Sequence, residues 1–279
     1  MLTKIMKYES KAMSRVLLPF YAALLASSLL SGLLLMFNRV RVDASDGMHV
    51  EISAADSIVS TLTIIFIFAF AVLVASISIA TLIAIIQRFN KGCLGDEGYL
   101  TFTLPVGIDT QLWARVLVSF FWTLLSLIVT GLCVFLMVIL TVGNLDFLSE
   151  IGEVVKEIFQ DPNAPIILTE LGVLSLLSLL VAPLGVYFCM SLGQIITPKH
   201  RIVGAFIVYF GMSFVAQILT SIFGTVTIQD QTLLDYLFTV RFEDFFHGFF
   251  LFNIATLILS GIVFYFVTRF LLSRKLNLE

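Results

Sequence analysis

Charge is scarce in this sequence. Only 13% of its 279 residues are Asp, Glu, Lys or Arg, whereas about a quarter of the residues in a soluble domain are charged. These 16 basic and 19 acidic residues are too few to cover a surface that faces water. A net charge of −3 also provides no basic surface for a nucleic acid. The composition therefore argues against a soluble domain and against a nucleic-acid partner.

Cysteine and histidine are also rare, and neither is arranged for metal or redox chemistry. The three cysteines, Cys93, Cys133 and Cys189, are an odd and scattered set without a CxxC pair, which excludes a disulfide framework. The three histidines form no HExxH motif, and no GxxxxGK[ST] phosphate loop occurs. We therefore predict no catalytic residue, no metal site and no cofactor on this chain.

Long apolar runs are what the sequence has in abundance. Its residues are 59% hydrophobic, with a mean hydropathy of +1.05. A helix of about 20 apolar residues crosses the hydrocarbon core of a bilayer. Six runs without charge at their centres are long enough: 16–37, 58–86, 116–142, 166–196, 202–223 and 249–272. We predict an all-α, polytopic membrane protein whose residues 1–279 form one domain with six transmembrane helices in the lipid bilayer.

The basic residues fall mainly on one side of these six runs. Twelve of the sixteen Lys and Arg residues lie at the two termini, between the second and third runs, or between the fourth and fifth runs, counting those at the ends of the runs. The positive-inside rule places these segments in the cytoplasm. Fourteen of the nineteen carboxylates lie on the other side, so the inner face has a net charge of +7 and the outer face −10. Both termini are predicted to be cytoplasmic in a bacterial cell membrane.

Three segments outside the spans carry their own patterns. Residues 1–15 alternate basic and apolar side chains at helical spacing, which predicts a cytoplasmic interfacial helix. Residues 143–165 are predicted to form an outer amphipathic helix, either a cap over a substrate path or a shield for the bundle. Residues 224–248 combine aromatic and acidic side chains, which predicts an apolar outer insertion before the last span, interfacial or re-entrant.

The inner segment 87–112 is the most informative. Asp96 and Glu97 are suited to cap a short helix, and Tyr99 and Phe102 give it apolar surface before Pro105 ends it. A short cytoplasmic helix between two spans is a contact surface for a soluble partner.

This segment resembles a motif in the membrane subunits of type-2 ABC transporters. Glu97-Gly98, Leu100 and Leu104-Pro105-Val106 match an acidic residue, a glycine, a leucine-rich stretch and a Pro-Val pair that precede the third span of that family. Tyr99 stands where the family usually has Thr, and Gly107-Ile108-Asp109 where it often has a basic residue. The opening Lys7-Tyr8-Glu9 with Leu18-Pro19, and the closing Lys275-Leu276-Asn277-Leu278, resemble uncharacterised permeases of this type from Gram-positive bacteria.

The resemblance implies a permease that works as a homodimer or heterodimer with a separate ABC ATPase subunit, which binds ATP and Mg²⁺. It implies export, and the uncharged spans suit an amphipathic cargo such as an antimicrobial peptide, a drug or a lipid. The predicted ATPase-docking residues are Asp96, Glu97, Tyr99 and Phe102, with Lys7, Tyr8 and Glu9. The alternative is a non-transporting membrane sensor or assembly factor that binds a partner through its outer helices.

Uncharged polar residues occur within the spans. Gln217, Asn253 and Tyr209 are candidates for a substrate path, and interhelical hydrogen bonding is the competing interpretation.

Overall fold

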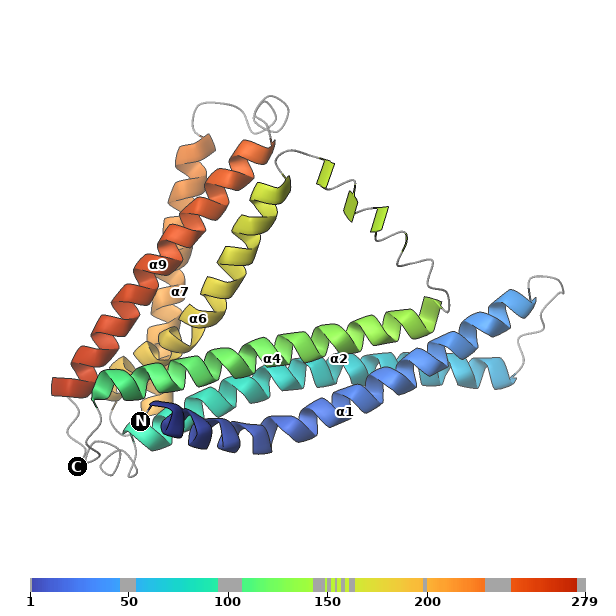
Figure 1. The fold of residues 1–279 in the computed structure, drawn as a ribbon, viewed down its shortest axis with the longest axis horizontal. Helices are drawn as coiled ribbons and strands as arrows, with labels where there is room; N and C mark the ends of the chain where they lie inside the picture. The colour runs from blue at the N-terminus through green and yellow to red at the C-terminus, as the bar shows by residue number, and fades with distance from the viewer. Residues whose placement is uncertain are drawn as a thin grey trace. The chain divides into compact units, whose positions relative to one another are not determined.

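A computed structural model describes residues 2–45, 54–94, 107–142, 164–197, 200–228 and 242–274, together with residues 149, 152–153, 155–156 and 159–160. These residues are almost entirely helical, and they include no β-strand. The six long helices are α1 (Leu2–Ser45), α2 (Ala54–Phe89), α4 (Ile108–Val142), α6 (Ala164–Ile196), α7 (Arg201–Ile228) and α9 (Phe242–Arg274), with a π-helical turn η1 (Asn90–Leu94) after α2 (Figure 1). Each long helix contains one predicted apolar run and is long and apolar enough to cross a membrane. The prediction of an all-α, six-span membrane protein is confirmed.

The helices extend beyond the apolar runs. The 36 residues of α2 make it about 54 Å long at 1.5 Å per residue, well over the about 30 Å of a hydrocarbon core. The third helix begins at Ile108, although its apolar run begins at residue 116. The amides of Thr110 and Gln111 donate to the carbonyl of Gly107 at 3.0 and 3.3 Å and so form its first turn. Both described ends of the inner segment 87–112 are therefore helical.

The same extension occurs in the predicted outer segments. Helix α7 continues to Ile228 and α9 begins at Phe242, so both ends of the predicted outer insertion 224–248 are helical. Residues 229–241 lie outside the described residues. In the other outer segment, 143–165, the described residues between 149 and 160 are all helical, as the amphipathic pattern predicts, and the side chains of Val155 and Phe159 are exposed.

The predicted interfacial helix is continuous with the first span. Helix α1 runs unbroken from Leu2 past Pro19, and Figure 1 shows it bending near its N-terminal end. Proline inside a helix removes one backbone hydrogen bond and kinks it. Met13 and Leu17 are buried, whereas the four basic side chains of this stretch are exposed: Lys4, Lys7, Lys11 and Arg15. The amphipathic pattern that the sequence predicts is thus present.

The chain divides into two compact units. One contains residues 7–84 and 121–158, that is α1, α2 and the second part of α4. Here Ser126 of α4 hydrogen-bonds to the hydroxyls of Tyr21 on α1, at 2.7 Å, and Thr81 on α2, at 3.3 Å. The indole of Trp122 donates to the Ser10 hydroxyl at 3.2 Å. These bonds fasten α1 and α2 to one face of α4.

The other unit contains residues 1–6, 85–120 and 159–279. Helix α6 packs against both α7 and α9 in it (Figure 1). The rings of Phe188 on α6 and Phe264 on α9 are 4.9 Å apart. Gly193 and Gly204 meet where α6 turns into α7, and a β-carbon on either would overlap backbone atoms of the other helix. Only glycine permits this close approach. The side-chain clusters that are named below, and the Glu170–His247 pair, lie in this unit.

Candidate functional site

The predicted docking segment is described at its two ends. Its first residues, 87–94, end α2 and form η1, and its last residues, 107–112, begin α4. The docking candidates Asp96, Glu97, Tyr99 and Phe102 lie outside the described residues, so their role stays a prediction. What the structure defines is how the two ends are held in the membrane domain.

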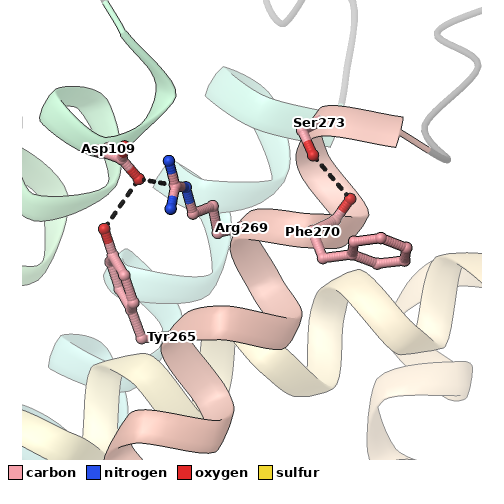
Figure 2. Close-up of polar contacts among 5 residues, drawn as sticks. All are labelled: Asp109, Tyr265, Arg269, Phe270 and Ser273. Carbon is pink, nitrogen blue, oxygen red and sulfur yellow. Dashed lines mark hydrogen bonds and ion pairs between the residues drawn. The ribbon is translucent and has the colours of Figure 1, made fainter.

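The end at α4 is bound to the last helix through Asp109. The Tyr265 hydroxyl donates to Asp109 Oδ1 at 2.8 Å, and Arg269 Nε lies 2.8 Å from the same oxygen (Figure 2). Tyr265 and Arg269 are four residues apart and therefore share one face of α9. Trp113, one turn after Asp109, packs its ring 5.6 Å from that of Tyr265. We call these four residues, Asp109, Trp113, Tyr265 and Arg269, the α4–α9 clasp.

The clasp contains an ion pair between Asp109 and Arg269, and both of these side chains are only partly buried. The side chains of Arg269 and Asp109 are 48% and 42% exposed. An ion pair at such a site contributes about 0–1 kcal/mol to stability. Its importance therefore lies in position, because it joins the first turn of α4 to the last turns of α9. The other bond in Figure 2, from Ser273 to the Phe270 carbonyl at 3.0 Å, stays within α9 and takes no part in the clasp.

The end at α2 is held by Arg115. Arg115 directly precedes the third apolar run, 116–142, and its side chain is buried in the protein with 6% exposure. Its Nη1 donates to the Arg88 carbonyl at 3.1 Å. The guanidinium also lies directly over Gly92 in η1, where an added β-carbon would come within 2.9 Å of Cζ. The position of the π-helical turn is therefore linked to α4 by a buried cation.

Tyr187 joins the same region to α6. It is almost fully buried, and its ring stacks on Phe89 at the end of α2 with centroids 4.3 Å apart and an interplanar angle of 13°. Its hydroxyl lies 2.8 Å from Ser119 Oγ and donates to the Arg115 carbonyl at 3.4 Å. We call Arg115, Gly92, Phe89, Tyr187 and Ser119 the stem cluster. Three helices, α2, α4 and α6, thus meet where the inner segment leaves the bundle.

The remaining predicted residues are separate from these clusters. Lys7 and Tyr8 are exposed and Glu9 is half-buried on α1, in the other unit. Among the substrate-path candidates, Tyr209 and Gln217 are exposed on α7. The Asn253 amide donates to the Phe249 carbonyl of its own helix at 2.8 Å. No hydrogen bond between described residues brings these three together, and the substrate path stays a prediction.

Sequence reasoning missed the role of one carboxylate. Glu170 is one of the fourteen carboxylates on the predicted outer side, but it is buried on α6 and its carboxylate contacts His247 on α9. The available signal was its position inside the apolar run 166–196, where an acidic residue is costly. Elsewhere in the described part of the chain, no group of three His, Cys, Asp or Glu residues could hold a metal ion.

No family model, curated protein or solved structure matches this chain. The resemblance to ABC permeases consequently rests on the residues quoted for it.

Proposed function

We propose that this protein is the transmembrane subunit of a type-2 ABC transporter. It works as a dimer of permease chains with a separate ABC ATPase that binds ATP and Mg²⁺, and it exports an amphipathic molecule from the cytoplasm. Six membrane-capable helices are consistent with this proposal. The observation that supports it best is that both ends of the inner segment are fastened to other helices, at the stem cluster and at the α4–α9 clasp.

A segment held in this way suits a mechanical role. Closure of the ATPases on ATP would press on residues 95–106, which leave α2 through η1 and return to α4. The stem cluster would pass this movement to α6, and the clasp would pass it to α9. A push on one short segment would then shift the bundle between states of different substrate affinity. A loop whose ends lacked such contacts would change its own conformation and would not move the other helices.

Co-purification tests the proposal. The tagged full-length chain is purified from its native membranes, and each co-purifying protein is sequenced by mass spectrometry and assayed for vanadate-sensitive ATP hydrolysis. We expect a subunit with a phosphate loop and no spans of its own. Glu97→Lys and Tyr99→Ala should reduce its recovery, whereas Glu153→Lys, on the exposed outer segment, should not.

Two results would count against different parts of the proposal. Absence of any ATPase with the wild-type chain would reject the transporter and favour a sensor or assembly factor. Equal recovery with wild type, Glu97→Lys and Tyr99→Ala would reject the docking residues alone.

A further inference from the structure

A buried acidic side chain lies near the outer end of α6. Glu170 is six residues from the first residue of the helix, Ala164, and is 9% exposed. It is therefore about 9 Å along the helix axis from its outer end. Ionisable groups are costly in membrane-crossing helices, where they usually mark a functional site and have an identifiable partner.

The partner of Glu170 is His247 at the outer end of α9. The His247 Nδ1 contacts Glu170 Oε1, and the contact is an ion pair when the imidazole is protonated. The other carboxylate oxygen, Oε2, is buried and accepts no hydrogen bond from any residue in the described ranges. The His247 side chain is 48% exposed, in contrast to the 11% of Glu170. One oxygen thus contacts a half-exposed side chain, and the other has no donor among the residues that the structure describes.

A purely structural role explains this arrangement less well. Helices α6 and α9 are already packed through Phe188 and Phe264 and through the close approach of Gly261 to Val181. A structural ion pair is stabilised when its remaining acceptors are satisfied, because an unsatisfied buried charge is unfavourable. Glu170 instead has a buried Oε2 without a donor among the described residues, and its partner His247 is half exposed at the surface of the protein.

We infer that Glu170 is a binding site for a primary ammonium group on an amphipathic molecule. An ammonium has three N–H donors and can satisfy both carboxylate oxygens with charge-assisted hydrogen bonds. It would displace His247, which competes for Oε1. The acidic outer side, with a net charge of −10 by sequence, raises the local concentration of cations. The identification of this molecule as the cargo rests on the proposed function, but the binding site does not.

Binding of n-octylammonium tests the site on the full-length chain. The protein is placed in nanodiscs of phosphatidylcholine at pH 8 without any ATPase, and radiolabelled probe is measured by equilibrium dialysis against empty nanodiscs. We expect saturable binding by wild type and about tenfold weaker binding by Glu170→Gln, which loses the charge-assisted pair. Octyltrimethylammonium, which has the same charge but no N–H donor, should bind much more weakly than octylammonium. Glu153→Gln, an exposed outer carboxylate, should bind as wild type.

His247→Ala separates a binding site from a structural pair. If Glu170 is a binding site, removal of the competing imidazole should tighten octylammonium binding several-fold. If the contact is only structural, removal of the imidazole should loosen it and should not tighten binding. Weaker binding by His247→Ala, or equal binding by wild type and Glu170→Gln, would overturn the inference. If Glu170→Gln fails to give a monodisperse protein, the direction of the His247→Ala change still decides. A chain that binds octylammonium but recovers no ATPase would retain this site and lose the proposed transporter function.

Discussion

Asp109 in the first turn of α4 binds Arg269 near the end of α9, with 2.8 Å between Oδ1 and Nε. The two residues are far apart in the sequence, and Asp109 lies at the α4 end of the predicted docking segment 87–112. Their contact gives the last span a connection to that segment which the chain order alone does not provide. The role of this connection is testable by exchanging the two charges.

Charge exchange should separate coupling from stability. Asp109→Arg and Arg269→Asp each place like charges opposite one another, so each should lower ATP-dependent transport while leaving ATPase recovery unchanged. The double variant Asp109→Arg with Arg269→Asp should recover much of the activity. Thermal unfolding should change by only about 0–1 kcal/mol, because the pair is partly exposed. Wild-type transport by both single variants would show that the clasp takes no part in coupling.

Gly92→Ala should damage the stem cluster. The new methyl group would displace the Arg115 guanidinium from a buried site and weaken its bond to the Arg88 carbonyl. We expect a loss of about 1–3 kcal/mol, as in other overpacked interiors, measured by unfolding in detergent. The matched control is Gly131→Ala in α4, where a β-carbon meets nothing within 4 Å. There the higher helix propensity of alanine should keep or raise stability. Equal effects at both positions would contradict the packing of Arg115 over Gly92.

Tyr187→Phe should isolate the hydroxyl of the stem cluster. It keeps the ring stacked on Phe89 but removes the bonds to Ser119 and to the Arg115 carbonyl. Interhelical hydrogen bonds in membrane proteins contribute about 0.6 kcal/mol on average, with a maximum of about 1.7, so a loss in this range is expected. Tyr209→Phe on the exposed face of α7 should leave the unfolding temperature unchanged. A larger effect at Tyr209 than at Tyr187 would contradict this account.

Thiol labelling in intact cells should test the orientation. The three native cysteines are buried, so background labelling should be low. Tyr8→Cys, at a position with 76% exposure, should react with a membrane-impermeant maleimide only after the cells are opened. Glu153→Cys should react in intact cells. The opposite pattern would reverse the topology.

The sequence predicts the helices well because length and hydropathy are local properties. The six runs locate α1, α2, α4, α6, α7 and α9, but the inner end of α4 differs by several residues. Arg115 directly precedes the third apolar run, a position typical of a cation at the membrane edge, since a cation in hydrocarbon is costly. Its cost is offset by the Arg88 carbonyl, 27 residues earlier in the chain, and sequence spacing does not reveal that contact.

The candidate sites are harder to predict than the spans because they depend on contacts between residues that are distant in the sequence. Asp109 with Arg269, and Glu170 with His247, are pairs between helices distant in sequence. Asp109, Arg269 and His247 are ordinary end-of-span residues when considered alone, and only Glu170, inside the run 166–196, stands out in the sequence. Their pairing depends on the packing of α6, α9 and the start of α4, which hydropathy does not specify. The docking residues 96–102 stay a prediction from the motif.

Site-specific crosslinking at residue 99 tests the central claim most directly. A photoreactive phenylalanine analogue replaces Tyr99 in the full-length chain, and the same analogue at Tyr209 serves as the control within the membrane domain. We predict that irradiation of native membranes links position 99, and not position 209, to an ATPase with a phosphate loop, with a yield that changes when ATP is added. Absence of an ATPase adduct from position 99, or equal adducts from both positions, would contradict the assignment of this protein as an ABC permease coupled through its inner segment.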